Sequence, residues 1–470
     1  MGQLVFQATL GGQVNLVGPN TASTFNLNVP AVAGTLVTTG DSATVTNTML
    51  AGSIANAKLL NSSVTVGSTS IALGASATTV TGLTLTSPTL TTPALGTPAS
   101  GTLTNCTGLP TSGLTGTISE ANGGTGTTTG YYGFKNRIIN GAMVIDQRNA
   151  GASVTVSSTS ALTYGVDRWF GYGNVASKFS IQQNAGSVTP PVGYVNYFGA
   201  TSLSAYSVGS GEYFVLGQKI EGYNIADLGF GTANAKAITL SFQVYSSLTG
   251  TFGGAVCNGA QTRSYPFTFT ISSANTWTPI TVTIAGDTGG TWVSTNAAGL
   301  NLWFGLGEGS TWTGTAGSWS SNDYRGATGA TSVVGTNGAT FYITGVQLEK
   351  GSTATSFDYR PYTTELQLCQ RYFEVLGCGT TLSGTATSNF QHMLRYVVTK
   401  RASPTFSLTG NYSVSCAGND QTITAIASIK FGNTAGCVLN VTPNNNIGVT
   451  NGQAVFYNEA SNVIQSSSEL

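Results

Sequence analysis

The sequence predicts an all-β chain with four parts: an N-terminal β unit, an extended shaft, a β-sandwich of jelly-roll type and a small C-terminal β domain. The first observation is composition, because 62 glycines in 470 residues, with abundant Thr, Ser and Val, favour short strands and tight turns over helices. The second is the recurrence of apolar residues at every second position. The third is an asymmetry: of 17 basic and 17 acidic residues, only three lie in the first 130.

Residues 1–40 have the spacing of a small β unit. Apolar side chains occupy alternate positions from Leu4 to Leu10, a Gly11-Gly12 turn follows, and the alternation continues as far as Pro30. Within the first 130 residues, only this segment has large apolar side chains at regular spacing. We therefore expect a folded β unit over residues 1–40.

Residues 41–130 predict an extended shaft. Leucine and proline each recur every five residues among small residues, at Leu85, Pro88, Leu90, Pro93, Leu95 and Pro98. Proline at this frequency excludes a helix interior or a central strand. The regular leucines favour an ordered stalk in which they face other copies of the chain, and a flexible linker is the alternative. The last part, residues 115–130, predicts a hinge.

Residues 131–362 predict a two-sheet sandwich. Segments rich in β-branched and aromatic residues alternate with turns of Gly, Asn and Ser, as antiparallel sandwiches require. The expected strands lie at residues 153–159, 178–183, 237–246, 277–286, 299–307 and 339–351. In residues 363–470 we expect a short helix over 363–373, with Leu366, Cys369 and Phe373 on one face, and then a second β unit.

Charge and motifs exclude several function classes. The sequence has no cluster of Lys and Arg, which nucleic acid or an anionic membrane would require. No apolar run approaches the roughly 20 residues of a membrane helix, and the N-terminus lacks a secretory signal, so we expect synthesis in the cytoplasm. The P-loop, GxSxG and HExxH motifs are missing, and His392 is the single histidine. We expect no catalysis and no cofactor.

The six cysteines are scattered without a CxxC pair. A zinc site would require clustered ligands, so we expect free thiols, buried or partly buried, and no metal site. A disulfide between Cys416 and Cys437 is the alternative.

Two short charged motifs predict structural ion pairs. Asp146-Gln147-Arg148 and Asp167-Arg168-Trp169 combine acids, arginines and apolar residues near the first strands of the sandwich. We also expect Arg137 and Arg360 to bridge to Glu349 or Asp358, where the two ends of the sandwich meet.

Aromatic residues in a glycine-rich loop predict a sugar-binding site. We expect Trp312 and Trp319 to be exposed there and to stack on sugar rings, with polar neighbours that bind hydroxyl groups. The candidate ligand-binding residues are Trp312, Trp319, Asn322, Asp323, Tyr324 and Arg325. The alternative is that these tryptophans cap the sandwich or pack at a subunit interface. Trp303, in an apolar run, is expected in the core.

Paired carboxylates could instead hydrolyse a polysaccharide, because glycoside hydrolysis uses two of them on either side of the bond. Asp287, Glu308 and Asp323 lie near tryptophan-bearing segments and are the candidates. Each is more simply explained as a turn residue or a solvated edge residue.

Motifs at the two ends of the sandwich resemble a module common in tailed-bacteriophage fibre and appendage proteins. The opening motifs are residues 136–143, 146–148 and 164–169, and the closing ones are residues 343–349, 357, 360–362, 365–366 and 369–374. The N-terminal GQLVFQATLGGQVNLVGPNTAST and the later ANGGTGTTTG are similar to the virion-attachment and shaft segments of those proteins. Residues 375–470 match no motif of the family.

The resemblance implies a homotrimer with a carbohydrate-binding-like sandwich. We therefore expect a virion tail fibre whose residues 1–40 contact other virion proteins and whose C-terminal half binds a cell-surface polysaccharide of the host. The alternatives are a capsid-anchored head fibre and a polysaccharide-degrading tailspike. A bacterial surface adhesin is disfavoured because the sequence has no signal peptide and no membrane anchor.

Overall fold

The computed structural model describes residues 5–7, 10, 13–15, 22–24, 60–84, 86, 134–376, 390–408, 412–416, 419–443, 455–458 and 464–470. The chain divides into two compact units, Met1–Leu109 and Pro110–Leu470. In the first unit β1 (Val5–Gln7) pairs with β2 (Gln13–Asn15), and β3 (Ser63–Val66) pairs with β4 (Thr69–Ala72), both antiparallel. The leucine–proline repeat and the whole of the expected hinge lie outside the described residues. The second hairpin was not predicted.

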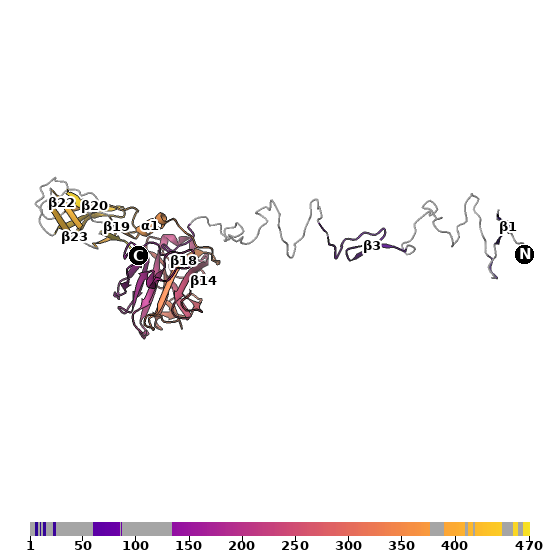
Figure 1. The fold of residues 1–470 in the computed structure, drawn as a ribbon, viewed down its shortest axis with the longest axis horizontal. Helices are drawn as coiled ribbons and strands as arrows, with labels where there is room; N and C mark the ends of the chain where they lie inside the picture. The colour runs from indigo at the N-terminus through magenta and orange to yellow at the C-terminus, as the bar shows by residue number, and fades with distance from the viewer. Residues whose placement is uncertain are drawn as a thin grey trace. The chain divides into compact units, whose positions relative to one another are not determined.

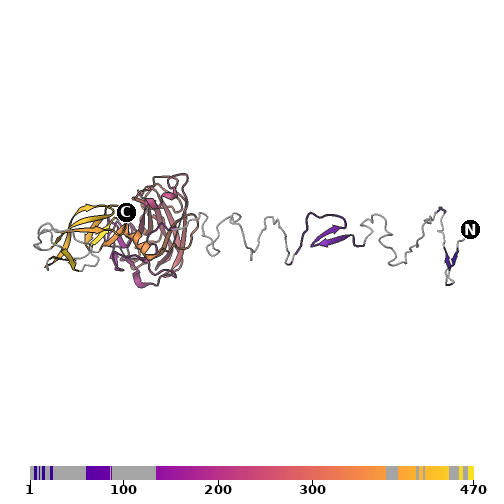
Figure 2. The ribbon, with the colours of Figure 1, turned by 90° about the horizontal axis from the view of Figure 1, so that it is seen from above.

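The second unit contains a sandwich of two antiparallel six-stranded sheets (Figures 1 and 2). In spatial order, the first sheet contains β13 (Ser264–Ile271), β12 (Gly250–Asn258), β15 (Ala298–Glu308), β10 (Tyr213–Glu221), β7 (Trp169–Gly173) and β6 (Thr163–Val166). The second contains β14 (Thr278–Ile284), β11 (Ile238–Ser246), β18 (Thr340–Lys350), β9 (Phe198–Ser202), β8 (Phe179–Gln183) and β5 (Val154–Thr155).

The main core lies between these sheets. Along each strand, successive side chains point to opposite faces of the sheet, so every second side chain points into this core. Phe304 of β15 and Phe341 of β18 meet there with ring centroids 6.4 Å apart, and both are fully buried. Consecutive strands repeatedly cross from one sheet to the other, as in a jelly roll. The expected fold class is confirmed for this unit, whereas the trimer stays a prediction.

All six strands expected in the sandwich are present, as β5, β8, β11, β14, β15 and β18. The sequence analysis did not identify β6, β7, β9, β10, β12 and β13. Three short 3₁₀ segments complete the sandwich, at Ala185–Ser187, Gly222–Asn224 and Ala226–Leu228.

The expected helix is α1 (Tyr362–Gln370), which lies where the sandwich meets the C-terminal sheets (Figures 1 and 2). Its Cys369 packs with Ile139 and Ile145 from the start of the sandwich. Leu366 contacts the same cluster. Phe373, expected on this helix, instead begins a strand.

Two sheets follow the helix. A three-stranded sheet contains β19 (Phe373–Leu376), β26 (Ile464–Ser467) and β21 (Thr405–Leu408). A five-stranded sheet contains β20 (Phe390–Arg395), β24 (Gly436–Pro443), β23 (Asn419–Gly432), β22 (Tyr412–Cys416) and β25 (Val455–Asn458). His392 lies on β20. The last described strand, β26, pairs with the strand that directly follows the helix.

Three cysteines are buried free thiols in the part of the chain that the structure describes: Cys257, Cys369 and Cys437. The free thiol of Cys437 contradicts the alternative of a disulfide with Cys416. Cys106 and Cys378 lie outside the described residues. No helix among the described residues is long and apolar enough to cross a membrane.

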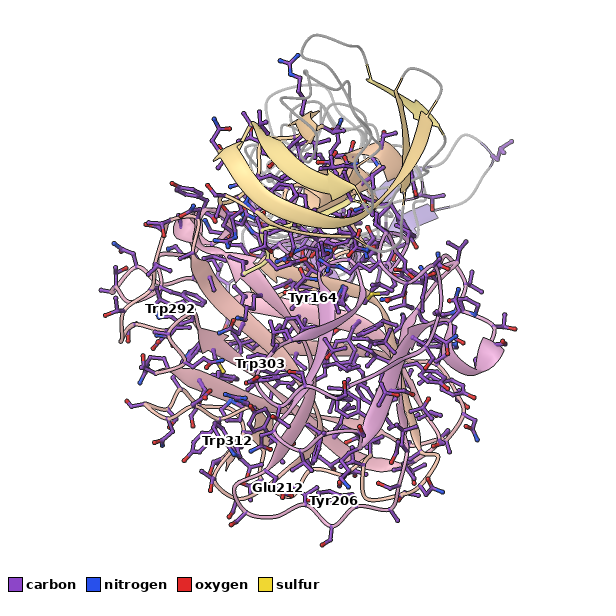
Figure 3. The ribbon with its side chains drawn as sticks, turned by 90° about the vertical axis from the view of Figure 1, so that its left-hand side faces the viewer. Tyr164, Tyr206, Glu212, Trp292, Trp303 and Trp312 are labelled. Carbon is purple, nitrogen blue, oxygen red and sulfur yellow. The ribbon has the colours of Figure 1, made fainter. Side chains whose placement is uncertain are left out.

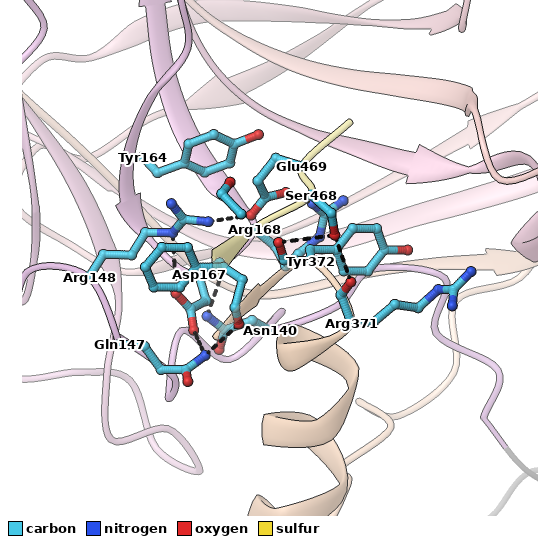
Figure 4. A network of polar contacts seen from close by, with 12 residues as sticks. Asn140, Gln147, Arg148, Tyr164, Asp167, Arg168, Arg371, Tyr372, Ser468 and Glu469 are labelled. Atoms are coloured by element: carbon cyan, nitrogen blue, oxygen red, sulfur yellow. Dashed lines mark hydrogen bonds and ion pairs between the residues drawn. The ribbon is translucent and has the colours of Figure 1, made fainter. Parts of the chain in front are cut away.

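A buried polar network joins the sandwich to the C-terminal residues (Figure 4). The Glu469 carboxylate forms ion pairs with Arg168 Nη1 and with Arg148 Nη2, the second at 2.5 Å. The Arg148 Nε atom lies 3.3 Å from Asp167 Oδ1. The structural ion pairs expected for the two motifs are therefore confirmed, but Glu469, 301 residues from Arg168, was not expected among their partners.

Aromatic rings and backbone groups complete this network. The Arg168 guanidinium carbon lies 3.7 Å from the Tyr372 ring centroid, and its Nη2 donates to the Lys219 carbonyl. The Tyr372 hydroxyl donates to Glu221 at 2.7 Å, and Arg371 pairs with the same carboxylate at 2.6 Å. Burial raises the pKa of the Asp167 carboxyl to about 7, although Arg148 opposes that shift.

The two ends of the sandwich meet through other acids than the sequence analysis named. Arg137 pairs with Asp227 at 2.8 Å, and Arg360 pairs with Glu365 at 3.2 Å. Asp358 contributes to the junction differently, by accepting the backbone N–H of Asn136 at 3.2 Å.

Replacing Glu469 with Gln should lower the free energy of unfolding by about 3 kcal/mol, because it leaves the buried Arg168 and the half-buried Arg148 without their shared carboxylate. The Arg168 side chain is only 2% exposed. Urea unfolding of the full chain, followed by tryptophan fluorescence, measures this change.

Asp227→Asn is the matched control. Asp227 also contacts two cations, Arg137 and Lys350, but its side chain is 33% exposed, so its loss should cost less than about 1 kcal/mol. Equal effects of the two substitutions would contradict a special role for Glu469.

Candidate functional site

The outer face of the first sheet carries a second layer of buried aromatic residues. Alternation places Phe170 and Tyr172 of β7, Tyr213 of β10 and Trp303 of β15 on the face that points away from the main core. Phe170 and Trp303 are fully buried and pack edge to face, with ring centroids 5.7 Å apart. The expectation that Trp303 is buried is confirmed, but it belongs to this outer layer.

A glycine makes room for the Trp303 ring. Gly217 of β10 is paired directly with Trp303 across the sheet. A Cβ atom at Gly217 would lie 2.7 Å from the indole Cε3, which no real side chain tolerates. The indole can therefore lie flat over the neighbouring strand and extend the aromatic layer.

The loop between β15 and β18 covers this layer. It is closed by β16 (Thr313–Gly314) and β17 (Gly326–Ala327), which pair in parallel. The backbone N–H of Arg325 donates to the Trp312 carbonyl at 2.8 Å, so these two residues lie side by side. The Trp312 indole N–H donates to the Gly211 carbonyl at 2.9 Å, which holds the ring over the sheet.

The loop places the Arg325 guanidinium in a cage of four rings. Its central carbon lies 4.0 Å from the ring centroid of Tyr213 and 4.3 Å from that of Trp312. Tyr172 and Trp303 complete the cage at 5.6 Å each, and Figure 3 labels both tryptophans. Burial is the main reason why the pKa of Tyr213 is raised to about 12, and the nearby Arg325 opposes that shift.

Asp323 pairs with Arg325 inside this cage. Arg325 Nη2 lies 2.9 Å from Asp323 Oδ2. Arg325 Nε and Nη1 and Asp323 Oδ1 are buried and have no hydrogen-bond partner among the described residues. Arg325 as a whole is 5% exposed. Buried polar atoms are normally satisfied, so this group of free donors and a free acceptor requires an explanation.

Tyr324 and Cys257 fix the loop to the sheet. The Cys257 thiol of β12 donates to the Tyr324 carbonyl at 3.2 Å, and burial raises the pKa of this thiol well above its usual value. The exposed Asn322 donates to the Tyr324 hydroxyl at 3.0 Å. Four of the six candidate residues, Trp312, Asp323, Tyr324 and Arg325, therefore gather at this cage with Asn322 beside them.

Trp319 lies in a different cluster. Its ring packs against Trp292, Phe230 and Tyr265, and its indole N–H donates to the Ala285 carbonyl at 2.7 Å. Both loop tryptophans were expected to be exposed, but each is partly buried and packs against a core cluster. Their hydrogen bonds to backbone carbonyls explain this burial, because each indole N–H that donates to the sandwich holds its ring against it. Both rings therefore pack against the sandwich, and sugar contact stays a prediction.

The three candidate hydrolytic acids have different surroundings. Asp287 forms a two-point ion pair with Arg263, whose bonds hold the pKa of that carboxyl below its usual value against the effect of burial. Glu308 lies against Gly305 and Gly326, and burial raises its pKa to about 8. Asp323 is paired with Arg325. Within the described stretches, no three His, Cys, Asp or Glu residues are placed to hold a metal ion.

Sequence reasoning missed the members of the cage that come from strands. Tyr172 and Tyr213 carried no signal beyond ordinary strand composition. Trp303 carried one, because every residue of the run LNLWFGLG except Asn301 is apolar, which indicates a strand buried on both faces. A strand of this kind requires a second layer outside the sheet, and the nearest loop rich in aromatics follows it directly.

Comparisons with known proteins give matches only among solved structures. A scan against protein-family models found no match, and a search of curated proteins found none. The enzymatically active domain of tailspike protein 4 of bacteriophage CBA120 matches 46% of this chain at 12% identity and a TM-score of 0.25, and the match spans 21% of the tailspike chain.

Two further matches concern proteins described as sugar-binding. A putative sugar-binding protein from Bacteroides thetaiotaomicron matches at 15% identity and a TM-score of 0.27, over 46% of this chain and 99% of that one. A family 11 carbohydrate-binding module from Clostridium thermocellum matches at 9% identity and a TM-score of 0.21, over 44% of this chain and 98% of that one. Identities and scores this low carry no argument about ligand or activity.

Glu308→Gln should flatten the dependence of stability on pH. Because burial raises the Glu308 pKa from 4.5 to about 8, the folded state binds a proton that the unfolded state releases within this range. The contribution of Glu308 to the free energy of unfolding is therefore greatest below pH 4.5, and it decreases as the pH rises to about 8.

Thermal melts of the native chain and of the Gln variant across this pH range measure the difference. The variant should melt at a higher temperature than the native chain near pH 8 and show a smaller decline, while Asp167 contributes equally to both. Parallel pH profiles would contradict a protonated Glu308.

Proposed function

We propose that this chain is a virion fibre, most simply a tail fibre, that binds a host cell-surface glycan through the cage around Arg325. Its residues 1–40 attach it to other virion proteins, and three copies form the fibre. The family resemblance of the N-terminal segment and of the motifs at both ends of the sandwich supports the fibre assignment. Its place is the virion, after synthesis in the host cytoplasm.

The observation that carries glycan binding is the combination of aromatic rings with free polar atoms at Arg325 and Asp323. A sugar presents apolar C–H faces, which pack on aromatic rings, and hydroxyl groups, which require both donors and acceptors. Tyr172 and Trp312 are partly exposed members of the cage and offer ring surface. The free Arg325 and Asp323 atoms offer the hydrogen bonds.

Binding without hydrolysis fits the placement of the acids best. An inverting or retaining glycosidase requires two carboxyl groups on either side of the scissile bond. Asp287 is occupied by Arg263, and Asp323 by Arg325. The tailspike alternative predicts that reducing sugar ends appear when the chain is incubated with the glycan that it binds.

Trp312→Ala should weaken glycan binding by about tenfold or more, because loss of a stacking ring costs on the order of 1–3 kcal/mol by analogy with other stacked rings. The assay is binding of the purified full chain to an array of extracted bacterial capsule and O-antigen polysaccharides. Light scattering on the same sample reports whether it is a trimer.

Trp277→Ala is the matched control. Trp277 is likewise partly buried, and its indole N–H also donates to a backbone carbonyl, that of Thr189 at 2.8 Å. It belongs to the cluster of Tyr197 and Tyr342 on the second sheet, so binding should be unchanged. Equal losses from both substitutions, or no binding by the native chain to any polysaccharide, would contradict the proposed site.

A further inference from the structure

The charge balance of the cage limits the sugars that it can accept. Asp323 compensates the positive charge of Arg325 at 2.9 Å, and no other acid or base pairs with Arg325 among the described residues. The caged pair is therefore neutral overall. Ligand groups that enter it meet a guanidinium and a carboxylate together, in an aromatic surrounding where charges interact strongly.

The free hydrogen-bonding atoms of the pair are of both kinds. Arg325 Nε and Nη1 can only donate, whereas Asp323 Oδ1 can only accept when ionised. They belong to two side chains already joined by an ion pair, so the free donors and the free acceptor lie close together. Two adjacent hydroxyl groups of one sugar ring match this arrangement, because one can accept from Arg325 while the other donates to Asp323.

We propose that the cage takes a neutral sugar and binds it through two adjacent hydroxyl groups. This inference rests on the proposed glycan binding and specifies the class of sugar. An acidic sugar is rejected, because its carboxylate would approach Arg325 next to Asp323 and would be repelled there. It would also lose its hydration on entering an aromatic site whose single cation is already paired.

Access to the pair is from the side of Asp323. The Asp323 side chain is 24% exposed, whereas that of Arg325 is 6% exposed. Trp312 covers the guanidinium, its indole N–H donates to the Gly211 carbonyl, and its ring packs edge to face with Tyr213 at a centroid distance of 4.8 Å. A sugar that reaches Asp323 first and displaces the Trp312 ring sideways would meet the free Arg325 atoms without a change in the strands.

The test compares matched sugars that differ only in charge. The probes are arrayed glucose, galactose and mannose and the uronic acid of each, which keeps the ring hydroxyls and replaces the CH₂OH group by a carboxylate. The native full chain should bind at least one neutral sugar about tenfold more tightly than its uronic acid. Added salt should leave this binding unchanged, since no net charge is neutralised.

The Asp323→Asn substitution removes the negative charge that compensates Arg325. The variant should bind the neutral sugar about tenfold or more weakly, because a hydrogen bond to a charged group is lost. It should bind the uronic acid more tightly than the native chain does, because Arg325 is then uncompensated. Asp227→Asn, the same change in an ion pair with Arg137 outside the cage, is the control and should keep the native preference. Circular dichroism confirms that each variant is folded.

The outcomes separate the two proposals. A native chain that binds no sugar or polysaccharide contradicts the proposed function itself. A native chain that prefers the uronic acids contradicts only the neutral-sugar inference, as does an Asp323→Asn variant with an unchanged preference. If the variant does not fold, the preference of the native chain alone decides the inference.

Discussion

The carboxylate of Glu469 is the contact on which the rest of the second unit depends. Glu469 lies in the segment that follows β26, the last strand of the C-terminal sheets. Its carboxylate neutralises Arg168 and Arg148, which lie in the sandwich. Arg168 is fully enclosed and has a positive φ of 72°, which is costly for a residue with a side chain. The ion pair with Glu469, the Tyr372 ring and the Lys219 carbonyl together hold it in place.

This network also sets the position of the candidate site. Arg168 is the last residue of the turn before β7, and the next residues, Trp169 and Phe170, point to opposite faces of the first sheet. Trp169 enters the main core, and its indole N–H donates to the Asn140 carbonyl of the same network at 3.0 Å. Phe170 and Tyr172 begin the outer aromatic layer. A change in the turn would therefore shift the floor of the cage.

The sequence revealed strands with one buried face, such as β14, and also β15, which is buried on both faces, but it did not reveal the glycine-rich β12 or contacts between distant residues. β14 alternates between half-buried and exposed positions and was predicted within a few residues, whereas the glycine-rich β12 (GTFGGAVCN) resembles a loop. Trp312, Asp323, Tyr324 and Arg325 were found because they are close in sequence. Their partner Tyr213 is about a hundred residues away, so only the register of β10 with β15 could reveal it.

A charged pair inside an aromatic cage contributes little to the stability of a sheet. Well-packed apolar side chains of similar size would cover the outer face of β15 at least as well, because a buried ion pair seldom recovers its desolvation cost. The loop instead places Arg325 and Asp323 there and leaves three of their polar atoms free. Side chains that lower the stability of the fold in this way are expected at functional sites. The Glu469 network also contains buried atoms without a hydrogen-bond partner among the described residues, Arg148 Nε, Asp167 Oδ1 and Arg168 Nε. The first two face each other in an ion pair at 3.3 Å, whereas the free atoms of the Arg325 cage have no such partner and can accept a ligand.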